Sequence, residues 1–425
     1  MKTKRHTLVG LLLLGLLSAG ISAEESNAEL PAIESLVREA YAHSPELRAA
    51  HARWASALER VPQARALPDP TVGYGYFIER METRQVFRVE QMFPGWGVRS
   101  SRADVADAGA RTAASALEVT AANLRLAVHE AVADWVLVGH SSRLVEENLG
   151  LIEQLEAVAL QRYRTGETSQ ADVLRLQSQA DVLRVDLESW KERRPAVQAR
   201  LNAILGRAPD HPVPEIETLP ISSEIPHPTP TAFFAAADNP DLKESQSAIH
   251  QAERARDLAR KASRPNLMVG LEYMDNRSMA PDELMAMVSV SIPIWQGNYR
   301  AQRREAAADL RAAEADYAAR FNRLQADARM ALYERQDAAR QVALFEDSLL
   351  PRARQTLSIL EGDYRTGRTS FLDLLEAQRT VLDLDLALVR ARSELFVRES
   401  RWERIAAPSP SLEISTSPTH PTSDE

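Results

Sequence analysis

The chain has 425 residues, of which 26% are charged and 44% hydrophobic, and its formal net charge is -9. It contains no cysteine, which excludes disulfides, thiolate metal sites, a cysteine nucleophile and a lipid-acceptor cysteine. The acidic balance argues against nucleic acid as a partner.

The first 23 residues have the pattern of a secretory signal peptide. A basic start is followed by a short apolar run at residues 8–17, and Ser22 and Ala23 end it with small side chains. This run is too short to span a bilayer, and no later stretch approaches the length of about 18 apolar residues that a membrane helix needs. We therefore expect an exported chain, cleaved after Ala23, without a membrane helix.

The rest of the chain contains two copies of one unit. Tyr163-Arg-Thr-Gly166 recurs as Tyr364-Arg-Thr-Gly367, and Ser44-Pro-Glu-Leu47 has a counterpart in Asn239-Pro-Asp-Leu242. Self-similarity over such a long period indicates an internal structural repeat. The predicted organisation is a first repeat at 31–207, a Pro-rich linker at 208–227, a second repeat at 228–406 and a disordered tail at 407–425.

Each copy is predicted to contain a helix, two strands, a long helix, a turn and a further helix. In the first copy the helices are predicted at 45–66, 98–164 and 170–205. The long segment carries a heptad seam of apolar and small residues: Leu117, Leu124, Ala131, Val138, Val145 and Ile152. Residues 299–365 repeat the seam with Leu310, Tyr317, Leu324 and Ala331. A helix of this length would extend roughly 100 Å, so we expect a helical hairpin rod.

Gly150 and Pro351 occupy equivalent positions in the two long helices. Both residues weaken helices. We interpret both as tolerated kinks rather than hinges.

Four strands are predicted, at 70–79 and 83–93 in the first copy and at 265–274 and 284–294 in the second. Segments of about ten alternating residues have the length of tilted membrane strands. A pair of isolated hairpins would be only marginally stable in water. Four strands cannot close a barrel, and open edges are not tolerated in lipid. Several chains must therefore pool their strands, and three chains of four strands would give twelve.

The duplicated layout, the two Tyr-Arg-Thr-Gly turns and the strand exit Phe93-Pro-Gly-Trp-Gly97 together resemble the TolC-type outer-membrane efflux protein family, over about residues 31–406. The resemblance implies a mainly α fold with a membrane β-barrel contribution. It implies a homotrimer with an α-helical barrel in the periplasm and a 12-stranded β-barrel in outer-membrane lipid, four strands per chain. The implied function is the passive exit duct of a tripartite efflux system, docked to a periplasmic adaptor (membrane fusion protein) and an inner-membrane pump.

Two segments look most like members that work with heavy-metal RND pumps. They are ALPDPTVGYGY at 66–76 and VEQMFPGWGVRSSRA at 89–103. This resemblance implies heavy-metal cations as the substrate.

The repeated turns first have a structural explanation. Gly166 and Gly367 suit the left-handed position after a helix. Ser169-x-x-Asp172 and Ser370-x-x-Asp373 are capping boxes with Asp in place of Glu. Capping does not account for the neighbouring aromatic and basic residues, and glycines let another backbone approach closely. We therefore assign adaptor docking to five residues of the turns: Tyr163, Arg164, Gly166, Arg365 and Gly367.

Asp373 and Glu376 lie one helical turn apart and so share a helix face. In a trimer they would form two stacked carboxylate rings, which favour cations. The resemblance implies such an acidic gate at the periplasmic tip. It also implies a tip latch that includes Asp172 and Tyr364, with Arg368 replacing a latch arginine where this chain has Thr369. Capping and gating are compatible roles for Asp373.

The remaining motifs indicate no further chemistry. Five of the nine methionines lie within residues 268–287: Met268, Met274, Met279, Met285 and Met287. Thioethers suit soft metals, but we interpret these side chains as lipid-facing or gap-filling. The histidines have no metal-ligand spacing and no nucleophile or phosphate-loop motif occurs, so we assign no metal, no cofactor and no enzymatic activity. The alternatives are a type I protein secretion duct and a periplasmic adaptor or coiled-coil scaffold.

Overall fold

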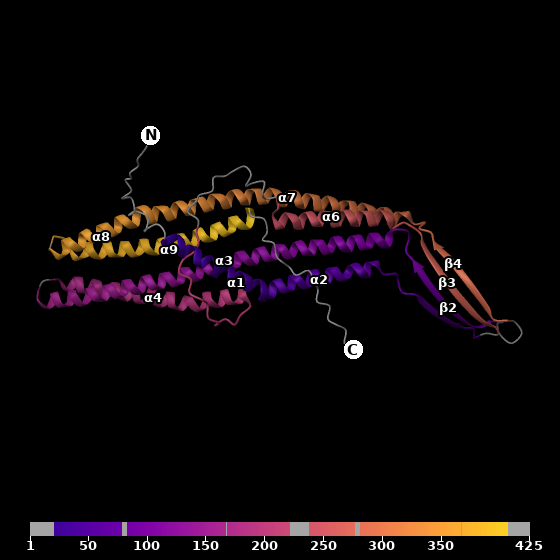
Figure 1. Ribbon diagram of the computed structural model, residues 1–425, viewed down its shortest axis with the longest axis horizontal. Coiled ribbons are helices and arrows are strands. Elements are labelled where there is room, and N and C mark those ends of the chain that lie inside the picture. Colours follow the sequence, from indigo (N-terminus) through magenta and orange to yellow (C-terminus); the bar gives the residue numbers. More distant parts are fainter. Residues whose placement is uncertain are drawn as a thin grey trace, which may run out of the picture. The chain divides into compact units, whose positions relative to one another are not determined.

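The computed structural model describes residues 21–78, 83–166, 168–221, 238–276, 281–366 and 368–406 (Figure 1). The tail, Gly367, Met279 and most of the predicted signal peptide lie outside these residues, as does part of the linker. The side chain of Arg365 is likewise outside the description.

The elements follow the duplicated plan. The first copy holds α1 (Ile21–His43), α2 (Pro45–Arg65), β1 (Thr71–Tyr76), β2 (Thr83–Phe93), α3 (Val98–Arg164) and α4 (Gln170–Leu205). The second holds α6 (Pro240–Lys261), β3 (Asn266–Asn276), β4 (Glu283–Ser291), α7 (Gln296–Ala343), the π-helix η2 (Leu344–Leu349), α8 (Leu350–Arg365) and α9 (Phe371–Ala406).

The two copies differ at their long helices. α3 is continuous for 67 residues through Gly150, whereas the predicted helix at 299–365 is divided into α7 and α8 by η2. Pro351 at the start of α8 has no N–H for an α-helical bond. The N–H of Leu350 instead donates to the carbonyl of Phe345, five residues back. The proline therefore coincides with a local change of helix type, which Gly150 does not cause.

Two of the strands end earlier than predicted. β1 stops at Tyr76, although the N–H of Phe77 still donates to the carbonyl of Arg84 across the hairpin. β4 stops at Ser291, because Pro293 soon follows and proline cannot donate to a ladder. Both corrections come from backbone hydrogen bonding that alternation of side chains does not report.

Two compact units are present, and they do not coincide with the two repeats. One contains residues 1–44, 123–228 and 329–404, and the other contains 45–122, 229–328 and 405–425. Each unit therefore includes parts of both copies, because α3 and α7 run through both units. The two units are described separately below.

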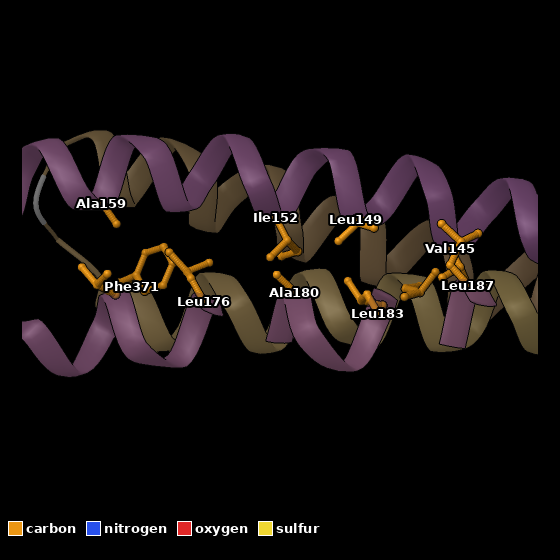
Figure 2. Close-up of a cluster of buried hydrophobic side chains, with 11 residues drawn as sticks. Val145, Leu149, Ile152, Ala159, Leu176, Ala180, Leu183, Leu187 and Phe371 are labelled. Atoms are coloured by element: carbon orange, nitrogen blue, oxygen red, sulfur yellow. The ribbon is translucent and has the colours of Figure 1, made fainter. Parts of the chain in front are cut away.

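The first unit contains both hairpin tips, with α3 against α4 and α8 against α9 (Figure 1). The predicted seam is confirmed, since all six of its heptad residues from Leu117 to Ile152 are buried. Figure 2 shows Leu149 and Ile152 of α3 facing Ala180 and Leu183 of α4. Phe371 of α9 joins the same cluster, so one core holds both hairpins together.

The second unit contains the four-stranded sheet. All neighbouring strands are antiparallel, in the order β1-β2-β3-β4, so the β2–β3 pair joins the two copies. The register places large apolar side chains on one face, which we call the apolar face: Val72, Tyr74, Phe87, Val89, Leu267, Val269, Leu271, Tyr273, Leu284, Val288 and Val290. Among the described helices of the chain, none is long and apolar enough to cross a membrane.

The core at the tips can be tested by shortening one buried side chain. Leu176 is 0% exposed in the shared cluster, whereas Leu174 on the same helix is 53% exposed. We expect Leu176→Ala to lower the free energy of unfolding by about 2–5 kcal/mol, because it removes buried methyl groups and leaves a cavity. Denaturant unfolding of the purified protein measures the loss. Leu174→Ala is the matched control, and an equal loss in both variants would contradict the assigned core.

Candidate functional site at the hairpin tips

The first tip is closed by a left-handed glycine and a serine cap. Gly166 has φ = 80°, which an L side chain would strain, and its N–H donates to the carbonyl of Tyr163 over 3.0 Å. Ser169 Oγ accepts from the N–H of Asp172 over 3.2 Å, and Asp172 Oδ2 accepts from Ser169 Oγ over 2.7 Å. The capping box predicted from Ser169 and Asp172 is therefore formed.

Two further side chains contact the Asp172 carboxylate at the start of α4. Thr168 Oγ1 donates to Asp172 Oδ2 over 3.1 Å, and Arg175 Nη1 lies 3.1 Å from Oδ1. The hydrogen bond from Ser169, with smaller help from Thr168 and Arg175, holds the pKa of the Asp172 carboxyl below its ordinary value. In this structure the carboxylate braces its own turn.

The second tip repeats this arrangement. Asp373 Oδ2 accepts from Ser370 Oγ over 2.6 Å and from Thr369 Oγ1 over 3.0 Å, while the N–H of Asp373 donates to Ser370 Oγ over 3.3 Å. The Ser370 and Thr369 hydroxyls hold the pKa of the Asp373 carboxyl below its ordinary value. Asp373 is thus an ionised cap, and its side chain is also exposed at the tip.

Arg368 is held within the second turn. Its Nη2 lies 3.0 Å from Asp363 Oδ1, and its Nε donates to Thr366 Oγ1 over 3.0 Å. The backbone N–H of Arg368 also donates to the carbonyl of Asp363 over 2.9 Å. The residue predicted to act in a latch therefore braces its own hairpin in this structure.

Tyr364 is the predicted site residue that connects the two hairpins. Its ring lies against Phe371, with centroids 5.7 Å apart, and the Arg162 guanidinium lies over it at 5.1 Å from the ring centroid. Arg162 belongs to α3, so this cation–π contact joins the first hairpin to the second. Sequence reasoning missed Arg162. The signal was available, because the equivalent position in the second copy holds Asp363, of opposite charge.

Glu376 lies on a groove between α4 and α9. The groove has a volume of about 470 Å³, and its lining combines apolar and charged side chains: Leu174, Arg175, Ser178, Gln179, Val182, Leu372, Leu375, Glu376 and Arg379. The structure therefore gives Asp373 and Glu376 different surroundings, a cap for the first and a groove for the second. Tyr163, Arg164 and Gly166 are exposed at the first turn, with open space where a side chain on Gly166 would be.

The apolar face of the sheet is a second candidate surface. Its side chains are exposed in the single chain, and two tryptophans follow the strands, Trp96 at 90% exposure and Trp295 at 80%. Contiguous exposed apolar surface marks contact with a membrane or a partner. In the described part of the chain, no group of three His, Asp or Glu residues is placed to hold a metal ion.

Comparisons with known proteins identify a family and a fold. A family model described as outer membrane efflux protein matches residues 36–207 and 234–401. A search of curated proteins found no match. The solved structure of VceC from Vibrio cholerae matches with a TM-score of 0.74 at 17% identity, over 89% of this chain and 97% of that chain. CusC matches at 0.77 and 17%, over 88% and 91% of the two chains. CmeC of Campylobacter jejuni matches at 0.72 and 12%, over 89% and 86%. At these identities the structural likeness establishes the shared fold.

The lowered pKa of Asp172 predicts how the first turn responds to acid. A depressed folded-state pKa stabilises the protein above the unfolded value of about 3.9, and this contribution is lost as pH falls through the folded pKa. We expect the stability difference between wild type and Asp172→Asn to be constant from about pH 7 to 5 and to shrink below about pH 4. Unfolding midpoints across this range measure it. Asp186→Asn, at an exposed site on α4, is the control. A difference that persists unchanged in acid would contradict the role of the carboxylate.

Proposed function

Because the chain belongs to the outer membrane efflux protein family, we propose that it is the exit duct of a tripartite efflux system. Membership of this family makes the chain an outer-membrane efflux channel protein. Its fold is mainly α-helical with a small sheet. In the proposed system an inner-membrane pump, of the RND class, supplies the energy. A periplasmic adaptor connects pump and duct, and the duct conducts passively.

The observation that carries this proposal is the sheet. It has one exposed apolar face, and β1 and β4 lie at its two edges. Unpaired backbone groups at a sheet edge are not tolerated in lipid, so a membrane sheet must close. Four strands from each of three chains would close a twelve-stranded barrel, an even number in the bacterial range. In a homotrimer the backbone groups at both sheet edges would therefore be paired, and the apolar face would point toward lipid.

The helical tips supply the periplasmic gate in this proposal. Asp373 is held ionised by its cap, and Glu376 lies one turn further along α9. Three chains would place two rings of carboxylates at the opening, which attract cations and repel anions. Asp172 and Arg368 brace their own hairpins, whereas the Arg162–Tyr364 contact joins the two hairpins, so opening would require this contact to rearrange. The acidic gate favours cations as substrate, and heavy-metal cations are the proposed class.

The groove between α4 and α9 is the proposed docking place for the adaptor. It lies between α4, which follows the first turn, and α9, which follows the second, and it offers Leu372 and Val182 together with charges of both signs. An amphipathic helical hairpin fits a groove of this kind through its apolar stripe. The same groove contains Glu376, so docking and gating would be coupled through one residue.

Channel recordings test the duct and its gate together. We expect the purified protein to conduct in planar bilayers with a preference for cations, and the double variant Asp373→Asn with Glu376→Gln to lose most of that preference. Reversal potentials in asymmetric salt measure the selectivity. Asp186→Asn is the matched control, because it removes an exposed carboxylate of α4 outside the proposed gate. Absence of conductance in the wild type would overturn the proposed function, and unchanged selectivity in the double variant would overturn the gate.

Adaptor docking is tested by filling the groove. Ser178 lines the groove, and Ser189 lies three turns further along α4 with the same bond from its hydroxyl to the carbonyl four residues back. We expect Ser178→Arg to abolish efflux-dependent metal tolerance and adaptor cross-linking in cells, while Ser189→Arg leaves both intact. Equal amounts of both variants in the outer membrane are required. Full tolerance in Ser178→Arg cells would contradict docking at this groove.

A further inference from the structure

Methionines gather on the face of the sheet opposite the apolar face. Side chains alternate between faces along a strand, and the register pairs Met92 with Met268 across β2 and β3. On the same face, Met274 is paired with Glu283, Met285 with Glu272, and Met287 with Gly270. The register thus places Met268, Met274, Met285 and Met287 on the face opposite the large apolar side chains, and their interpretation as lipid-facing or gap-filling stays a prediction.

The surroundings of these methionines are polar. Arg88 lies on this face, with Nη2 2.5 Å from Glu272 Oε2 and Nε 3.6 Å from Glu90 Oε1. Glu272 is only 6% exposed. Charged side chains are costly on the lipid side of a membrane strand and tolerated in the lumen. This face, which we call the methionine face, is therefore the lumenal one in the proposed barrel.

Gly270 leaves space on the methionine face for a methionine side chain from the neighbouring strand. A Cβ added to Gly270 would lie 3.8 Å from Met287 Cε and 3.1 Å from Glu90 Cγ. Met287 therefore reaches over β3 from β4, toward the side where Met92 and Met268 are paired. Directly paired residues have Cβ atoms about 4.5–5.5 Å apart, so the flexible side chains of that pair can turn both sulfur atoms toward one ion.

The chemistry of the face selects one class of ligand. Thioether sulfur is a soft, neutral donor that suits monovalent cations such as Cu(I) and Ag(I), whereas carboxylates suit harder ions. The chain has no cysteine that would hold such ions more tightly. Weak sites in series allow an ion to enter and to leave again, which conduction requires. Glu90, Glu272 and Glu283 outnumber the arginines of this face, Arg84 and Arg88, and favour cations over anions.

We propose that the methionine face is a thioether path for soft monovalent metal cations. Its residues are Met92, Met268, Met274, Met285 and Met287. The proposal rests on the proposed function and specifies its substrate class. Methionine is otherwise rare in this chain, since Met330 is the sole methionine of the described residues outside the sheet.

The test is silver binding by the purified full-length protein in detergent. We expect wild type to bind Ag⁺, and a variant with leucine at Met92, Met268, Met285 and Met287 to bind it roughly tenfold more weakly or worse. Leucine conserves the volume of methionine. Met330→Leu is the matched control, because this methionine is 57% exposed on α7. Isothermal titration measures affinity, and X-ray absorption at the silver edge identifies sulfur ligands.

The proposal is overturned by the absence of Ag⁺ binding in wild type, or by equal binding in the leucine variant. If the leucine variant fails to assemble, oxidation of the wild type by peroxide replaces it. Bound Ag⁺ should protect the five methionines of the face from sulfoxide formation and leave Met330 unprotected, and equal oxidation with and without Ag⁺ would also overturn it. Bilayer conductance of the same samples distinguishes the two hypotheses. A conducting protein without silver binding refutes only the thioether path, whereas a non-conducting protein refutes the duct.

Discussion

The packing of α4 and α9 against the far end of α3 determines the geometry of the tips. Ile152 and Leu176 bury their side chains in the same cluster as Phe371, which directly follows the capping Ser370. A residue fixed in a core cannot rotate freely, so the cap beside it is fixed as well. The positions of Asp373 and Tyr364 follow from this burial. The polar contacts at the tips thus depend on the packing of the apolar seam. Substitutions in the seam would therefore alter these contacts.

The sequence predicted the features that depend on local period. Residues seven apart from Leu117 to Ile152 are buried because a long helix presents them on one face. Ser169 and Asp172 form their box because capping involves residues only three apart. The bounds of β2 agree with the predicted segment 83–93, since alternation there runs to the proline after Phe93. Each of these features depends on residues that lie close together in the sequence.

Features that depend on contacts between distant segments could not be predicted from local sequence patterns. The contact of Arg162 with Tyr364 joins residues about two hundred positions apart, and only the packing of the hairpins brings them together. The groove that contains Glu376 needs α4 and α9 side by side. Helix periodicity placed Asp373 and Glu376 on one face, but it could not report that the first is a cap and the second lines a groove. The faces of the methionines likewise required the register of the sheet, because a shift by one residue exchanges the two faces.

Duplication gives the two hairpins one backbone plan, and charge differences give their side chains different contacts. Arg162 corresponds to Asp363, and Arg175 corresponds to Glu376. In each pair the first copy is basic and the second acidic. Arg162 lies over the Tyr364 ring and Arg175 pairs with Asp172, whereas Asp363 pairs with Arg368 and Glu376 lines the groove. On the proposed function, carboxylates at the tip attract a cation without regard to softness, and thioethers in the sheet distinguish soft ions from hard ones.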